Sequence, residues 1–94
     1  MRLIEIIRSP DLGNDDDMTI YVARPWASDA EAILVNPAPE QTDPIERNGR
    51  SFDYFLEAFI ARDFLEDLAA SGTMEGASEQ QRCERLIRYA GTDA

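Results

Sequence analysis

Carboxylates are the most abundant reactive groups in this chain of 94 residues, which carries 19 acidic and 9 basic side chains. They are densest in the segment D-L-G-N-D-D-D at positions 11–17, and carboxylate oxygens are the ligands that calcium and magnesium prefer. The spacing lacks the alternation of a calcium-binding loop and has no glutamate at the required distance downstream. We therefore interpret 11–17 as a solvated surface loop and predict no metal site.

Paired carboxylates such as Asp29 with Glu31, or Glu57 with Asp63, could perform general acid and base chemistry if burial separated their pKa values. With this many acids, such pairs arise by chance. The chain has no histidine and no lysine, so the usual general base and the Schiff-base nucleophile are both missing. Cys83 also lacks a base to activate it and falls on an apolar helical stripe. We predict no catalytic residue and no cofactor, with Cys83 in the core.

The formal net charge is −10, and every basic side chain is an arginine. Nucleic acids and anionic membranes are poor partners for such a chain, because binding to phosphates depends on cationic groups. A basic protein surface would be attracted instead, since opposite net charge steers encounter. The alternative is that acidity serves solubility alone.

Two sets of residues are candidates for contact with another protein. Trp26 comes just after a predicted strand and lies beside Arg24 and Pro25, and tryptophan and arginine are both enriched at binding hot spots. In the alternative interpretation Trp26 closes the edge of the core. Asp53, Phe55 and Glu57 would share one strand face, either as an exposed surface of acids and aromatics or beneath helices that bury Phe55.

The first half of the chain predicts one short helix and two strands. Leu3, Ile4 and Ile7 have helical spacing, although Ile4 and Ile6 would also suit a strand. Residues 18–24, M-T-I-Y-V-A-R, alternate and are rich in β-branched types, which favours a strand ended by Pro25. Residues 31–35, E-A-I-L-V, predict a second strand paired with the first.

The second half predicts a long loop, a strand and two helices. Residues 36–50 contain three prolines and a glycine among polar residues, which indicates a mobile exposed loop. Over 52–70 the apolar positions change phase, so we predict a strand at 52–58 and a helix at 59–70 that Gly72 ends. Ser78 and Gln81 have the spacing of a capping box, and Gly91 is the expected end of the last helix.

These elements define a single α+β domain over residues 1–94, in the order α-β-β-β-α-α. Three consecutive strands without helical crossovers predict a three-stranded antiparallel meander packed with helices, because parallel pairs need long crossovers.

Three strings carry a family resemblance: T-I-Y-V-A-R-P-W with D-A-E-A-I-L-V, then Y-F-L-E-A-F-I-A-R-D-F-L-E, and finally R-L-I-R-Y-A-G-T-D-A. The chain resembles a small bacterial domain of unknown function whose neighbouring families are immunity-type proteins of toxin systems. The resemblance implies a compact α+β domain and a protein-binding role, with no functional residues to carry over. Gly91 and Thr92 depart from the pattern at the end of the last helix.

We expect a cytoplasmic, non-enzymatic, acidic protein-interaction module that uses Arg24, Trp26, Asp53, Phe55 and Glu57. Its partner would be another protein with a basic surface, such as a toxin or effector, or a second copy in a homodimer. The apolar run at the amino terminus is too short for a secretory signal, and no stretch is long enough to span a membrane. The alternative is a small enzyme or ligand-binding protein built on Arg24, Arg62 and Glu57.

Overall fold

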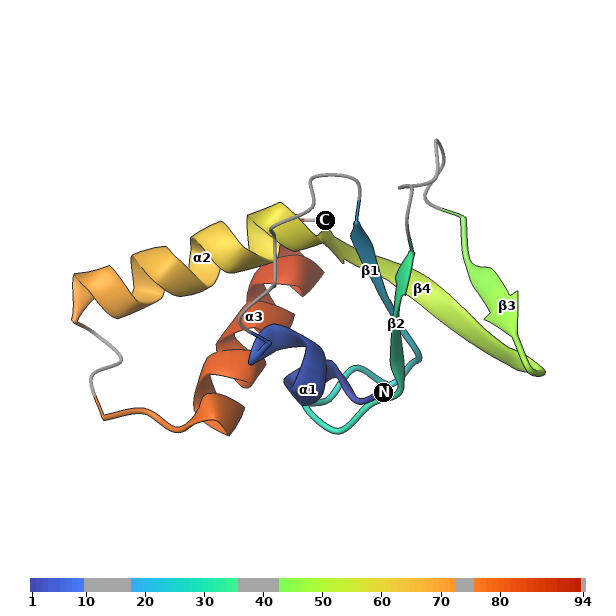
Figure 1. The fold of residues 1–94 in the computed structure, drawn as a ribbon, viewed down its shortest axis with the longest axis horizontal. Helices are drawn as coiled ribbons and strands as arrows, with labels where there is room; N and C mark the ends of the chain where they lie inside the picture. The colour runs from blue at the N-terminus through green and yellow to red at the C-terminus, as the bar shows by residue number, and fades with distance from the viewer. Residues whose placement is uncertain (10–17, 36–42, 73–75, 94) are drawn as a thin grey trace.

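The computed structural model describes residues 1–9, 18–35, 43–72 and 76–93, which form three helices and one antiparallel sheet of four strands (Figure 1). In chain order the elements are α1 (Leu3–Ile7), β1 (Thr19–Val22), β2 (Ala32–Val35), β3 (Ile45–Arg47), β4 (Arg50–Glu57), α2 (Ala58–Ser71) and α3 (Glu79–Asp93). The predicted α+β class is confirmed. No helix in these ranges is long and apolar enough to cross a membrane.

The sheet has four strands in the order β2-β1-β4-β3, so the predicted three-stranded meander is wrong. The additional strand, β3, lies inside the predicted loop and forms a hairpin with β4. Asn48 and Gly49 connect the two strands with φ angles of 54° and 77°, the left-handed conformation that a two-residue hairpin turn requires. The rest of that loop, at 36–42, lies outside the described residues, as does the predicted acidic loop at 11–17.

A β-bulge at Phe55 decides which side chains of β4 face the helices. Tyr21 pairs with Tyr54 and Ile20 with Leu56, so Phe55 is the extra residue on β4. Phe55 and Leu56 consequently both pack in the core beneath the helices, while Tyr54 packs on the other side of the sheet. The prediction that Phe55 and Glu57 share a face is therefore wrong, because strict alternation stops at the bulge.

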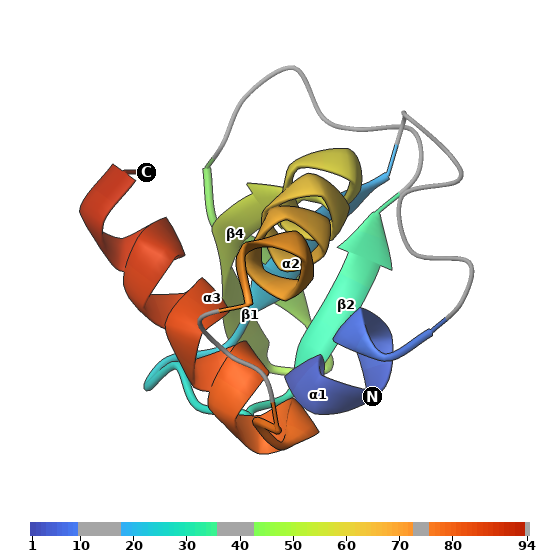
Figure 2. The same cartoon turned by 90° about the vertical axis from the view of Figure 1, so that its left-hand side faces the viewer.

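The helices cover one side of the sheet (Figures 1 and 2), and β3 curls onto the other side (Figure 1). Two apolar clusters result. The inner cluster, between sheet and helices, is centred on the fully buried Leu3, Ile20, Val22, Phe55, Cys83 and Leu86. The outer cluster, on the side of β3, consists of Tyr21, Ala23 and Phe52 with the half-buried Ile33, Val35, Ile45 and Tyr54.

The predicted helices are confirmed, with one error at a terminus. The strand and helix predicted over 52–70 correspond to β4 and α2, and Gly72 ends α2 with a φ of 75°. At the start of α3 the Gln81 backbone N–H donates to Ser78 Oγ and the Ser78 N–H donates to Gln81 Oε1, which completes the capping box. α3 continues through Gly91 to Asp93, so Gly91 is not the helix terminator.

Candidate functional site

Arg24 is the second residue after the end of β1 and contacts two of the predicted interaction residues. Its Nε donates to Asp53 Oδ2 at 2.9 Å, and its guanidinium carbon lies 3.8 Å from the centre of the Trp26 ring. The Arg24 side chain is nevertheless 61% exposed, while that of Asp53 is 32% exposed. A cation fixed by both a carboxylate and an aromatic face is held in one orientation at the surface.

Trp26 is fixed from two further directions. Its indole N–H donates to the Val22 carbonyl at 3.2 Å, and its ring meets Phe55 edge-to-face, with centroids 5.0 Å apart and planes at 78°. Phe55 is fully buried in the inner cluster. The ring therefore connects the surface at Arg24 with the core, and we call Arg24, Trp26, Asp53 and Phe55 the Arg24 corner.

The register of the sheet explains why these residues meet. Asp53 lies opposite Val22, two residues before Arg24, so the two charged side chains reach each other across the pair of strands. Val22 belongs to the inner cluster, which places Asp53 on the helix side of the sheet. Phe55 follows two positions later on the same side, beneath Trp26.

Two open grooves flank the connection from β1 to β2, which runs beside α1 and the first turns of α3 (Figure 2). The first, the Arg24 groove, has a volume of about 700 Å³, and its charged lining residues are Arg24, Asp29, Glu31, Arg50 and Asp53. The second, the Trp26 groove, has a volume of about 510 Å³. It contains the half-buried Ile4, Trp26 and Ile87, edged by polar residues that include Asp29 and Glu84.

The structure brings together four of the five predicted interaction residues but changes the role of one. Phe55 supports Trp26 from the core and is not a surface residue, in agreement with the alternative in which helices cover its face. Glu57 is separate from the corner, because it lies opposite Thr19 at the far end of the β1–β4 pairing. The bulge turns it away from Phe55, toward Tyr54 on the outer side.

Sequence patterns did not single out the residues that complete the Trp26 groove. Ile4 and Ile87 counted only as apolar positions of helices, and Asp29 only as one member of a chance pair of carboxylates. Gln80, Glu84 and Ile87 have the i, i+4, i+7 spacing of one face of α3, which was the signal available. That spacing indicates a groove only when α1 and the β1–β2 connection are known to lie beside this face of α3.

The described residues place the candidate reactive groups apart from one another. Within them, no group of three or more histidine, cysteine, aspartate or glutamate side chains could hold a metal ion. Cys83 is fully buried, as predicted, and burial raises the pKa of its thiol to about 11, with a further contribution from Glu84. The alternative cluster of Arg24, Arg62 and Glu57 is not assembled. Arg62 pairs with Asp63 on α2, while Arg24 and Glu57 lie toward opposite ends of the β1–β4 pairing.

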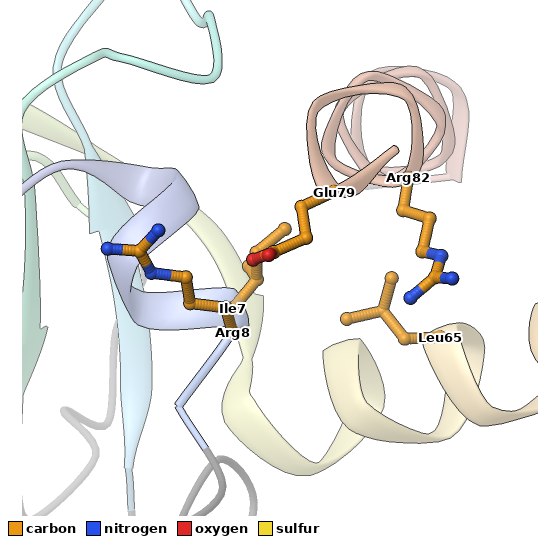
Figure 3. Close-up of a pocket in the computed structure, with 5 residues that line it drawn as sticks. All are labelled: Ile7, Arg8, Leu65, Glu79 and Arg82. Carbon is orange, nitrogen blue, oxygen red and sulfur yellow. The ribbon is translucent and has the colours of Figure 1, made fainter. Parts of the chain in front are cut away.

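A third pocket, of about 540 Å³, lies where α1, α2 and α3 meet (Figure 3). Its lining includes two arginines, Arg8 and Arg82, beside Ile7, Leu65 and Glu79. Figure 3 shows the guanidinium of Arg82 beside Leu65, whereas that of Arg8 points away from Glu79 and Arg82. Because the two cations do not converge, this pocket has no shared position for an anionic ligand.

Comparison of the chain with models of protein families, with curated proteins and with solved structures found no match. The geometry of the Arg24 corner and its two grooves is therefore the basis on which we infer a function.

Proposed function

We propose that this protein is a non-enzymatic interaction module that binds another protein through the Arg24 corner and the grooves beside it. The observation that carries the proposal is the Arg24 guanidinium, which is held by Asp53 and Trp26 and yet remains 61% exposed. A side chain that is already ordered loses less conformational entropy on binding than a free one. Arginine and tryptophan are also the residues most enriched among hot spots of protein interfaces.

The partner in this proposal is a protein with a basic surface. The net charge of −10 attracts such a surface and repels nucleic acid and anionic membranes. Neutralisation of a basic toxin or effector in the cytoplasm is one form of the proposal, in keeping with the resemblance to immunity-type proteins. Homodimerisation is a separate alternative, which would use the half-buried apolar residues of the outer cluster, on the other side of the sheet, in place of the Arg24 corner.

A ligand-binding protein is the alternative function, and the Arg24 groove favours it. That groove is within the size range of small-molecule sites and presents guanidinium and carboxylate groups together. An open groove that mixes charged and apolar side chains nevertheless suits a protein contact better than an enclosed ligand, because ligand sites usually bury most of the ligand in a predominantly apolar lining.

Capture of partners from the source organism tests the proposal. The tagged wild type and the variants Arg24→Ala, Trp26→Ala and Arg62→Ala are compared at low and moderate salt, with light scattering on each purified sample. Arg62 is the matched control, because it also pairs with an aspartate but lies on α2. We expect a stoichiometric basic partner that dissociates as salt rises and is lost from the first two variants only.

Two results would contradict the proposal. One is the absence of a stoichiometric partner at either salt concentration. The other is capture that is equally strong for the wild type and for the Arg24 and Trp26 variants, since binding would then not use the corner.

A further inference from the structure

The Trp26 groove has walls that are fixed to one another. The backbone N–H groups of Leu3 and Ile4 donate to the carbonyls of Ala30 and Ser28, both at 2.9 Å, which attaches the start of α1 to the β1–β2 connection. α3 packs against α1 and contributes Gln80, Glu84 and Ile87 to the groove. The groove is therefore largely formed before any ligand binds, which reduces the entropic cost of binding.

The groove contains three large apolar side chains that are incompletely covered. Ile4, Trp26 and Ile87 line it from three different segments, and all three are half-buried. Trp26 has its polar edge satisfied by the Val22 carbonyl, so the indole presents aromatic carbon rather than an unpaired donor. An apolar side chain inserted here would remove surface of all three residues from water.

The edge of the groove is acidic. Asp29 and Glu84 are exposed, and neither has an ion-pair partner among the described residues. The cation at the same edge, Arg2, already pairs with Glu5 at 3.4 Å. Two carboxylates without ion-pair partners beside three large apolar side chains complement a ligand that combines apolar and cationic groups.

We infer that the Trp26 groove binds a basic amphipathic segment of a partner protein. An apolar side chain of that segment contacts Trp26, Ile4 and Ile87, and flanking arginine or lysine side chains reach Asp29 and Glu84. This inference rests on the proposed function, because it names the class of partner that the interaction module recognises. An amphipathic helix is the usual occupant of such a groove, with its apolar face inward and its charges at the edge.

The Arg24 groove is the weaker candidate for the same segment. Of its three acids, Asp53 is paired with Arg24 and Glu31 with the terminal amine of Met1 at 3.3 Å. Arg24 and Arg50 add two cations to its lining, which would repel a basic ligand. The Trp26 groove has a single cation in its lining, Arg2, which is paired with Glu5, and its two acids have no ion-pair partner among the described residues.

Trp26 is the only tryptophan in the chain, so its fluorescence reports directly on this groove. The probes are three synthetic helical peptides of about 18 residues, or about five turns. The first has leucine on one face and arginine on the other; the second replaces arginine with glutamate, and the third replaces leucine with glutamine. Titration at an ionic strength of about 0.15 M screens long-range attraction to the acidic chain.

We expect a saturable change in Trp26 emission with the leucine–arginine peptide and no binding of the leucine–glutamate peptide. The glutamine–arginine peptide should bind about tenfold more weakly, because it lacks the apolar contact. Equal affinity for the two arginine peptides would overturn the inference, since general electrostatic attraction would then explain the binding. Absence of binding by all three peptides would overturn it as well.

Charge reversals at two exposed acids locate the binding site. Glu84→Arg should weaken binding of the leucine–arginine peptide by about fivefold or more, as expected for reversing one surface charge beside a cation. Asp67→Arg makes the same change on an exposed position of α2 and should leave the affinity within about twofold. Ile87→Ala, which keeps the charge, should also weaken binding.

Equal weakening by Glu84→Arg and Asp67→Arg would show that net charge, rather than the groove, attracts the peptide. The titration uses purified protein and synthetic peptides, so its outcome does not depend on capturing a cellular partner. If a captured partner requires Arg24 and Trp26 but is unaffected by Glu84→Arg, the interaction module stands and this inference fails. If no partner is captured at all, the proposed function fails whatever the peptides do.

Discussion

Two aromatic pairs connect β4 with β1 or with the residues that follow β1, and each side of the sheet has one of these pairs. Trp26 and Phe55 meet on the helix side at 5.0 Å and 78°, and Tyr21 and Tyr54 meet on the outer side at 6.0 Å and 88°. Both are edge-to-face contacts, the arrangement favoured by aromatic quadrupoles. The two pairs therefore use the same physical interaction in different surroundings.

The surroundings determine what each pair can do. Tyr21 is enclosed by Ala23, Phe52 and the half-buried side chains of β2 and β3, so the outer cluster is a second small core. Trp26 carries the exposed Arg24 guanidinium on one ring face and lines an open groove. An aromatic contact becomes a candidate binding feature where the chain leaves the sheet, and it remains structural where strands enclose it.

The largest effects are expected when the buried phenylalanine on either side of the sheet is replaced. Phe55 is 0% exposed and Phe52 is 4% exposed, and truncation of such side chains to alanine costs about 3–5 kcal/mol. Phe55→Ala and Phe52→Ala should therefore destabilise the protein to a similar extent in urea denaturation. Only Phe55→Ala should also change the emission of Trp26 in the folded state, because it removes the edge-to-face partner.

Phe52→Ala is the matched control, since it alters packing on β4 without contacting Trp26. A shift of Trp26 emission of equal size in both folded variants would mean that the two clusters are not independent. In that case the Arg24 corner would depend on the whole sheet rather than on Phe55.

High pH should weaken the outer cluster. Burial raises the pKa of Tyr21 and of Tyr54 above the ordinary value of 10.0, and the charges of Asp43 and Glu57 respectively add to the shift. The folded state therefore holds these protons more tightly than the unfolded state. The resulting stabilisation is complete below about pH 10 and is lost as the pH rises through the folded pKa values. The urea concentration at the midpoint of unfolding should therefore be lower at about pH 10.5 than at about pH 8.

Two variants separate the groups that contribute to this fall. Tyr21→Phe should reduce the dependence on pH that begins near 10. Cys83→Ala should remove a second contribution, which is lost between the ordinary thiol value of 9.0 and the raised pKa of about 11. An unchanged pH dependence in Tyr21→Phe would show that the outer cluster does not favour the protonated phenol.

Local patterns in the sequence predicted much of the fold. The change of apolar phase over 52–70 located the boundary between β4 and α2, and the pair Ser78 and Gln81 located the start of α3. Asn48-Gly49 is an equally local hairpin signal, and β3 was missed because the surrounding prolines favoured a loop. The bulge at Phe55 was not predictable in this way, because it depends on the register between strands far apart in the chain.

The candidate site was predictable in its residue types but not in its arrangement. Arg24 and Trp26 stood out by residue type, but the contact of Arg24 with Asp53 spans 29 positions and arises only when β1 pairs with β4. Glu57 was grouped with Phe55 by strict alternation, which the bulge interrupts. The Trp26 groove combines α1, the β1–β2 connection and α3, so no single segment predicts it.

The smallest effect on stability is expected at the ion pair of the Arg24 corner. Asp53→Asn removes the charge opposite Arg24 while keeping the shape of the side chain, and exposed ion pairs contribute about 0.2–1 kcal/mol. The free energy of unfolding should therefore change little, whereas partner binding should weaken because the guanidinium loses one of its two fixed contacts. Parallel urea denaturation and partner capture at moderate salt measure the two effects. Full binding by Asp53→Asn would mean that stacking on Trp26 alone orients Arg24. The contrast between the two aromatic pairs would then depend on the Trp26 ring and not on the Asp53 carboxylate.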